Sequence, residues 1–236
     1  MTRKLLFLFI STLLISCSST KNSFENKGFY KSGELKYEYS IVDSKREGIT
    51  KEYYKNGKLK FEWNYKDNNL EGETIEHQLD GTYSVWIYNS NNLVEGKSYF
   101  KNGSIYESFN FKNGKRNGIA YRYYETGEKE TVWEFENDIV ITGKGYYPSG
   151  EEKIDFKYKN GIPEGISTEY DKNGKILREY LYKDGNLNGI TNEYYENGEL
   201  KFEWKYQGGK LNGKSKEYYN TGQLKNTWTY KDDKLI

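Results

Sequence analysis

Glycine recurs along this chain at a nearly constant spacing, and that spacing limits the fold more than any other feature does. Nine glycines are separated by steps of 24, 24, 22, 24, 23, 24, 24 and 24 residues. An aromatic motif such as Tyr53-Tyr54-Lys55-Asn56-Gly57 precedes most of them. A fixed period of this length is typical of repeat arrays, in which each unit contacts only its neighbours. These turn glycines are Gly33, Gly57, Gly81, Gly103, Gly127, Gly150, Gly174, Gly198 and Gly222.

Between the glycines, apolar and charged residues alternate as they do in a half-buried β-strand. From Leu200 to Tyr206 every second residue is apolar, and lysine or glutamate fills the positions between. A second glycine follows most turn glycines after 15 residues, as Gly72 follows Gly57. We therefore expect two strands and two chain reversals in each unit.

The Asn-Gly turn allows two strand registers. A two-residue loop pairs Tyr195 with Leu200. A three-residue loop that ends on a left-handed glycine pairs Tyr194 with Leu200, and it also pairs Ile190 with Trp204. We favour the three-residue loop because it brings more apolar side chains together. In this register the second tyrosine of each aromatic pair points away from the main aromatic face, since a one-residue slip inverts a strand.

These patterns predict an all-β fold, an elongated, twisted antiparallel β-meander of about nine stacked hairpin repeats over residues 28–236. Two strands in each unit give about eighteen strands, or roughly 86 Å at 4.8 Å per strand. A sheet of that length is expected to twist and curve.

The N-terminus has the pattern of an export signal. Arg3 and Lys4 precede an apolar run from Leu5 to Ile15, which is about half the roughly 20 residues that a membrane-spanning helix needs. Ser16 and Cys17, the only cysteine, follow this run, and the sequence Leu14-Ile15-Ser16-Cys17 resembles a bacterial lipobox. We therefore predict a lipoprotein signal peptide over residues 1–16, lipidation of Cys17, and a polar tether over residues 17–27. The alternative is an ordinary secretory signal with an incidental thiol.

Composition argues against several classes of function. The chain has 36 basic and 35 acidic residues, and these are interleaved, so a nucleic-acid partner is not expected. It has one histidine, and it lacks both a nucleophile motif and a glycine-rich phosphate loop. We therefore expect no enzyme activity, no catalytic residues, no metal and no cofactor.

Two segments resemble the core of a MORN repeat. They are Asn113-Gly114-Lys115-Arg116-Asn117-Gly118-Ile119-Ala120-Tyr121 and Gly209-Lys210-Leu211-Asn212-Gly213. The step of 22 to 24 residues, with Leu-Lys before Glu-x-x-Tyr, is closer to the bacterial MORN-variant repeat. The resemblance covers about residues 28–236 and implies an extended antiparallel meander. Bacterial proteins of this type are often grouped as YwqK-like antitoxins of toxin–antitoxin systems, so the resemblance also implies an antitoxin-like or immunity-like role.

The aromatic residues point to a binding surface. Five tryptophans and 25 tyrosines in one sheet form rows of rings, and such rows suit protein partners or, as the alternative, glycans. We expect most of these rings to form the core of the sheet, around residues such as Phe202 and Trp204. The candidate binding surface is the set of tyrosines predicted to lie off that face, namely Tyr54, Tyr124, Tyr195 and Tyr219.

Together these features predict a non-catalytic lipoprotein of the cell envelope. The lipid anchor would hold it in a membrane, and Ser18 after Cys17 favours the outer membrane, facing the periplasm. Its expected partner is another envelope protein.

The third unit departs from the pattern. His77 and Gln78 replace the aromatic pair before Gly81, and Trp86 lies one position off the usual phase. One interpretation is a local binding site or kink that contains the only histidine. The other, which we favour, is sequence drift in an array that tolerates one weak unit.

Overall fold

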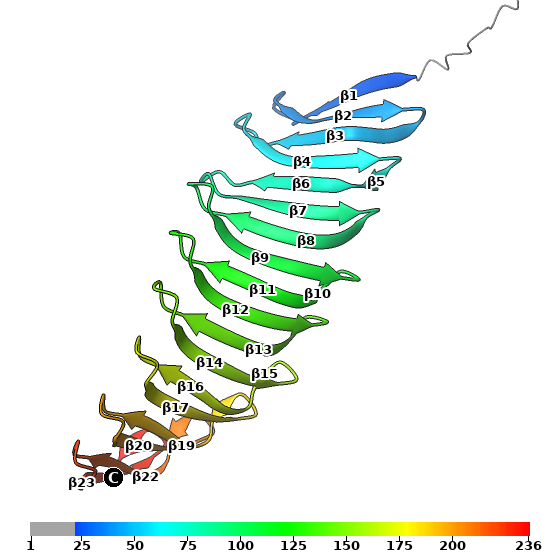
Figure 1. Cartoon of the computed structure of the whole chain (residues 1–236). Coiled ribbons are helices and arrows are strands. Elements are labelled where there is room, and N and C mark those ends of the chain that lie inside the picture. Colours follow the sequence, from blue (N-terminus) through cyan, green and yellow to red (C-terminus); the bar gives the residue numbers. More distant parts are fainter. Residues whose placement is uncertain (1–21) are drawn as a thin grey trace, which may run out of the picture.

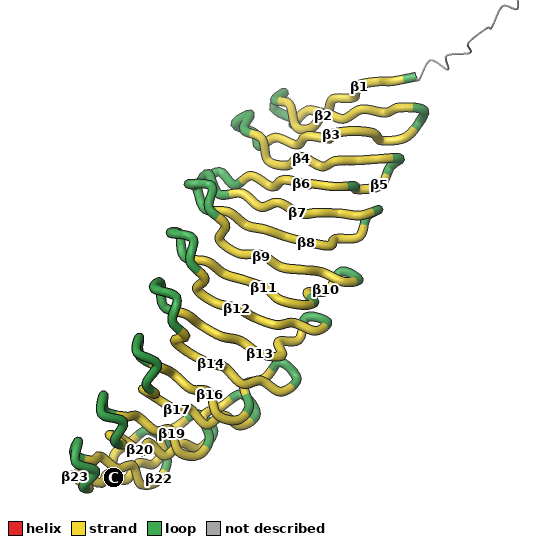
Figure 2. The backbone as a smooth tube through the Cα atoms, viewed as in Figure 1, coloured by secondary structure: helices red, strands yellow, loops and turns green. Residues whose placement is uncertain are grey.

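The computed structural model describes residues 22–236, which form one long antiparallel β-sheet of 24 strands. Figure 1 shows the strands stacked side by side in chain order in a single twisted layer. Figure 2 shows that the loops lie along the two edges of this layer. The predicted elongated meander of hairpins is confirmed. Cys17 and the predicted signal peptide lie outside the described residues, and within residues 22–236 no helix could cross a membrane.

Eighteen of the strands are long. They are β1 Ser23–Phe29, β2 Leu35–Val42, β3 Lys45–Tyr53, β4 Leu59–Lys66, β6 Gly72–His77, β7 Tyr83–Asn89, β8 Asn92–Tyr99, β9 Ile105–Lys112, β11 Gly118–Tyr123, β12 Lys129–Glu136, β13 Ile139–Tyr146, β14 Glu152–Lys159, β16 Gly165–Tyr170, β17 Ile176–Lys183, β19 Gly189–Tyr194, β20 Leu200–Gln207, β22 Gly213–Tyr218 and β23 Leu224–Lys231. Six strands have two residues each. They are β5 Asn69–Leu70, β10 Lys115–Arg116, β15 Ile162–Pro163, β18 Asn186–Leu187, β21 Lys210–Leu211 and β24 Lys234–Leu235.

The two edges of the sheet use different turns. At one edge, as at Tyr195, the backbone N–H of Gly198 donates to the carbonyl oxygen of Tyr195 (2.9 Å), and Gly198 is left-handed with φ 88°. This is the predicted three-residue loop, and Tyr194 pairs with Leu200 as expected. At the other edge both turn residues have positive φ, as in Asp67 (51°) and Asn68 (68°), which is the type I′ geometry.

The second glycine series does not form the second reversal, contrary to our expectation. The chain turns at Asp67 and Asn68, and Gly72 comes later, at the start of β6. Before Gly72 the strand is interrupted at Glu71, whose N–H donates to the carbonyl oxygen of Asn64 (2.9 Å). The positive φ of Gly72 (74°) returns the chain to regular pairing after this irregularity, a conformation that favours glycine.

The predicted pairing of Ile190 with Trp204 is also wrong. A β-bulge between Glu193 and Tyr194 leaves Lys201 as an extra residue, so that Thr191 faces Trp204 instead. Ile190 pairs with Lys205 on the opposite face and is exposed. The same bulge occurs in most units, because a three-residue loop with a bulge matches the twist of the flanking strands.

The N-terminal boundary also differs from the prediction. Residues 23–27 were assigned to the tether, but they belong to β1, which pairs with β2 over its whole length. An edge strand of polar sequence needs only its backbone partners to join a sheet, and its exposed face tolerates polar side chains.

Candidate functional site

Each repeat places one large ring at the same point of the sheet, and these rings define what we call the aromatic face. In β4, for example, Phe61, Trp63 and Tyr65 alternate with Glu62 and Asn64, which point to the other side, the charged face. In the second to ninth repeats the ring row of the aromatic face consists of Trp63, Trp86, Phe109, Trp133, Phe156, Tyr180, Trp204 and Trp228, and Tyr39 holds this position in the first repeat.

Small residues separate the rings of this row and are the most buried residues in the sheet. Thr50 lies opposite Trp63 and is 4% exposed, whereas Ser215 lies opposite Trp228 and is fully buried. Small residues leave room for a ring to approach the backbone, as Trp86 does at Gly96 and Trp133 does at Gly143. The other buried small residues that lie opposite rings of this row are Thr74, Ala120, Ser167 and Thr191.

Gly143 shows how closely a ring approaches the backbone. A Cβ atom on Gly143 would lie 2.2 Å from Cε3 and Cζ3 of Trp133. Trp133 therefore lies flat over Gly143, with Ala120 on its other side in the ladder. The side chain is half-buried, so the indole still presents surface to solvent. The backbone of Gly143 is not left-handed, so its conformation does not require glycine. The close contact with the Trp133 ring does, because a side chain would collide with the ring.

The four tyrosines predicted as a binding surface lie at the edge of the three-residue loops. Tyr54, Tyr124 and Tyr195 donate their hydroxyl groups to backbone carbonyl oxygens of the next repeat, at 3.0, 2.8 and 2.8 Å. The acceptors are His77, Tyr146 and Tyr218. These three tyrosines therefore link neighbouring repeats.

Tyr219, the last of the four, is 49% exposed. Within residues 22–236 its hydroxyl has no equivalent acceptor, although Lys225 Nζ lies 5.6 Å from its ring. The four tyrosines are spaced along one edge and form no common cluster. Their role as a ligand-binding surface stays a prediction.

The predicted orientation of these tyrosines is wrong. Lys60 Nζ lies 5.7 Å from the Tyr54 ring and 5.1 Å from the Phe61 ring, which places Tyr54 on the aromatic face. The first tyrosine of the pair faces the other way, since Tyr53 donates its hydroxyl to Glu38 Oε1 (2.6 Å). The bulge causes this inversion, because it places the extra lysine on the same side as the following ring.

The first tyrosines form a hydrogen-bonded row on the charged face. Tyr194 donates to Glu179 Oε2 at 2.6 Å, 15 residues earlier in the chain. Burial, together with this hydrogen bond, raises the pKa of Tyr194 to about 12. For Tyr53 the hydrogen bond to Glu38 is the main cause, and it raises the pKa to about 12 as well. Neutral tyrosine is the form that these carboxylates stabilise.

The irregular third unit lacks this bulge. β6 and β7 pair without interruption, and Trp86 still faces Thr74, as Trp63 faces Thr50. The missing residue explains why Trp86 follows its turn glycine one position early. His77 takes the place of the first tyrosine, with Nε2 3.1 Å from Glu62 Oε1. The pairing of the large ring with a small residue is therefore the same in the third unit as in the others. The shorter spacing between Gly81 and Trp86 was the sequence signal that the other units contain a bulge.

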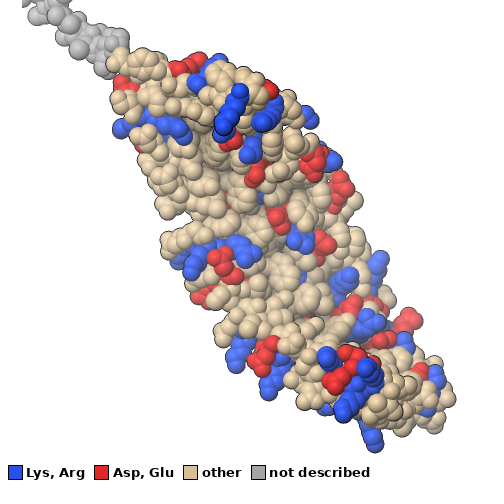
Figure 3. Space-filling model, turned by 180° about the vertical axis from the view of Figure 1, so that it is seen from behind, with Lys and Arg blue, Asp and Glu red and all other residues tan. Residues whose placement is uncertain are grey.

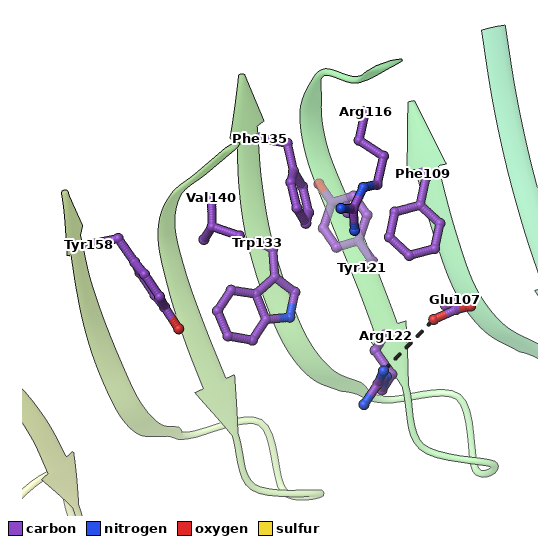
Figure 4. Close-up of a pocket in the computed structure, with 10 residues that line it drawn as sticks. Glu107, Phe109, Arg116, Tyr121, Arg122, Trp133, Phe135, Val140 and Tyr158 are labelled. Carbon is purple, nitrogen blue, oxygen red and sulfur yellow. Dashed lines mark ion pairs between the residues drawn. The ribbon is translucent and has the colours of Figure 1, made fainter. Parts of the chain in front are cut away.

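A shallow hollow opens on the aromatic face in the middle of the array (Figure 4). Its volume is about 260 Å³. Trp133 of β12 lies toward its centre, and Tyr158 of β14 stands at one side. Burial raises the pKa of the Tyr158 phenol, so this ring stays neutral at ordinary pH.

Two arginines complete the hollow. The Arg116 guanidinium lies between the rings of Phe135 and Phe109, at 4.4 and 5.9 Å from their centroids. Arg122 is 46% exposed in its side chain, and its Nη2 lies 3.9 Å from Glu107 Oε2. Such a long, solvent-exposed ion pair contributes little stability, and the Tyr106 ring, 5.4 Å from the guanidinium carbon, takes up none of its N–H donors, so Arg122 remains available to a ligand.

A second hollow adjoins the loop edge of the same face. Its volume is about 470 Å³, and it exists because Thr131, Gly145 and Ile154 occupy positions where other units carry a larger ring or a carboxylate. Phe156 and Tyr180 line its wall. Among the described residues no group of three or more His, Cys, Asp or Glu side chains is arranged to hold a metal ion.

Figure 3 shows the molecule from behind the view of Figure 1. Charges of both signs are spread along this side, with uncharged surface between them. No single-sign block covers that view, in agreement with the interleaved charges of the sequence.

Comparison with known proteins identifies the repeat type. Four segments match the MORN repeat variant, at residues 46–67, 163–184, 187–207 and 211–232. In these four segments the chain is similar to MORN-variant repeats, and this supports the resemblance given by the sequence. No curated protein matches the chain.

Solved structures add only distant similarities. A porin-like protein from Bacteroides uniformis is 8% identical, with 87% of this chain and 94% of that chain covered and a TM-score of 0.24. The TcdB2–TccC3–Cdc42 complex contains a chain that is 10% identical, with 92% of this chain and 13% of that chain covered and a TM-score of 0.17.

Proposed function

We propose that this chain is a non-catalytic scaffold that binds a protein partner along its aromatic face. The observation that carries the proposal is the uninterrupted row of half-buried rings from Trp63 to Trp228 on a single-layer sheet, in which Trp86 and Trp133 lie against the backbone of Gly96 and Gly143. Tyrosine, tryptophan and arginine are the residues that dominate the binding energy of protein interfaces. A long repeat array offers such residues over an extended surface.

We also propose an antitoxin-like or immunity-like form of this function, in which the bound partner is neutralised. Its support is the MORN-variant repeat type together with the envelope location expected from Cys17. A lipid on Cys17 would place the array at the membrane surface. Replacement Cys17→Ala should then abolish metabolic labelling with a fatty-acid analogue and release the protein from membranes. Unchanged labelling and fractionation would argue against the anchor.

Co-purification tests the main proposal. The full chain, tagged at its C-terminus and extracted from its own membranes in mild detergent, should carry one specific protein in near-equal amount. An unrelated lipoprotein purified in the same way is the control. Recovery of the same proteins with both baits would contradict the proposal.

Glycan binding is the second candidate function, and the flat position of Trp133 over Gly143 favours it, because sugar rings stack on exposed aromatic faces. Retention of the purified chain on peptidoglycan or on a glycan array, without a protein partner, would support this function instead.

A further inference from the structure

The repeats of this array can be compared with one another, and the comparison singles out the hollow around Trp133. Arg116 is the second residue of the short strand β10. The same position holds Leu70 in β5, Leu187 in β18 and Leu211 in β21. A guanidinium therefore replaces an aliphatic side chain at this point of the aromatic face, as it also does at Arg46 of β3.

Arg122 is the second exception in the same hollow. It is the fifth residue of β11, and the fifth residue of β6, β16, β19 and β22 is glutamate. These glutamates are Glu76, Glu169, Glu193 and Glu217. Replacing glutamate by arginine reverses the charge at this position, and both exceptions line one hollow.

From this pairing of exceptions we infer that the hollow binds a carboxylate carried by an acidic segment of the protein partner. The inference rests on the proposed function and specifies the partner's chemistry. Arg116 uses Nε for its hydrogen bond to Asp138 Oδ1 (3.2 Å), so its terminal amino groups can still donate. Arg122 has a 3.9 Å contact with Glu107, and its guanidinium carbon lies 5.4 Å from the centroid of the Tyr106 ring, so its N–H groups can still donate. Two guanidinium groups beside an indole suit a carboxylate next to an apolar side chain.

Glu107 is the one acidic side chain in the lining of this hollow. It competes with an incoming carboxylate for Arg122. The inference therefore predicts that Glu107→Gln strengthens binding, whereas a ligand that carries no negative charge would not respond in this direction.

The test uses the full chain in detergent and two labelled ten-residue peptides, one alternating Glu and Phe and one alternating Gln and Phe. Fluorescence anisotropy should show that the Glu peptide binds and that the Gln peptide binds at least about tenfold more weakly. Arg122→Glu and Arg116→Leu should each weaken the Glu peptide about tenfold or more, and added salt should do the same. Both variants introduce the residue that other repeats carry, so the fold should tolerate them.

Arg46→Leu is the matched control. Arg46 also lies between two rings, at 4.6 Å from Tyr39 and 4.8 Å from Tyr65, but Glu52 occupies the position of Arg122 in its unit. This variant should leave the affinity for the Glu peptide unchanged. Circular dichroism and thermal melting check that all variants fold.

Three results would overturn the inference. They are equal binding of the two peptides, unchanged affinity in both arginine variants, and binding of oligogalacturonate, an acidic sugar chain, in place of the Glu peptide. If a co-purified partner stays bound to Arg122→Glu with full affinity, the inference fails while the proposed function stands. Loss of every partner from the wild-type chain would instead contradict the proposed function.

Discussion

Tyr195 donates its hydroxyl to the carbonyl oxygen of Tyr218 across 2.8 Å, and the two residues are 23 positions apart. Equivalent bonds join Tyr30 to Tyr53 and Tyr147 to Tyr170. The second tyrosine of the aromatic motif thus links its repeat to the next one through a hydrogen bond. In a single-layer sheet this matters, because every unit depends on its neighbours for stability.

Removal of one such link should lower stability measurably. Tyr195→Phe loses the hydroxyl and should reduce the free energy of unfolding by about 0.5 to 1.5 kcal/mol. Tyr219→Phe is the control, since that hydroxyl has no equivalent acceptor within residues 22–236. Chemical denaturation followed by tryptophan fluorescence measures both variants. Equal losses in the two variants would show that the hydrogen bond is not the cause.

Gly143→Ala should force the Trp133 indole off the backbone. The added methyl group would lie 2.2 Å from Cε3, so the ring must move, at a cost of about 1 to 3 kcal/mol. Trp133→Phe introduces the ring that Phe109 and Phe156 provide at equivalent positions. The double variant should therefore lose less stability than the two single losses added together. Strict additivity in thermal melting would mean that the ring does not press on Gly143.

The bulge residue Lys60 should be dispensable. Its deletion converts the second unit to the spacing of the third, so Trp63 should still face Thr50. The losses are the weak contact between Lys60 and Glu52 at 3.7 Å and the contacts of Lys60 Nζ with the rings of Tyr54 and Phe61, each about 1 kcal/mol or less. Far-ultraviolet circular dichroism and the melting temperature should therefore change little.

Deletion of Val85 is the matched control for this prediction. The third unit has no extra residue to give up, so the deletion should turn Trp86 away from Thr74 and lower stability much more. Equal effects of the two deletions would contradict the assignment of the bulge.

Stability should fall at alkaline pH in a way that Tyr194 controls. Its pKa rises from the ordinary value of 10.0 to about 12 in the folded chain, so the folded state holds this proton more tightly than the unfolded state does. The contribution is complete below about pH 10 and is lost as the pH rises toward 12. Tyr194→Phe should show a shallower loss between these values in denaturant titrations. A slope as steep as that of the wild-type chain would refute this role.

The sequence predicted the period, the eighteen long strands and the three-residue loops because each depends on local residues, chiefly glycine and alternating side chains. The sequence did not predict the β-bulges, because a bulge adds one residue to a strand and at Lys60 and Lys201 that residue is an ordinary lysine of the alternating pattern. Trp63 follows Gly57 by six residues, whereas Trp86 follows Gly81 by five. That difference indicates a bulge in the second unit. The bulge can be assigned only from the strand pairing, in which Trp63 faces Thr50 and Trp86 faces Thr74.

The candidate site was harder to predict than the fold. Aromatic rows were expected to form the core and the second tyrosines to point away from it. Instead, Tyr54, Tyr124 and Tyr195 are hydrogen-bonded between repeats, and the rings keep exposed surface. A single layer explains the difference, because no second sheet covers the rings of residues such as Trp133. The exceptional arginines, Arg116 and Arg122, were visible in the sequence only after the strands had been aligned.

Site-specific photo-crosslinking tests the central claim most directly. A benzophenone amino acid at Tyr158, on the aromatic face, is compared with one at Glu62, on the charged face, in the full chain in living cells. We predict a discrete crosslinked protein from position 158 and none from position 62. Crosslinks from position 62 alone, or no protein adduct from either position, would contradict a protein partner on the aromatic face.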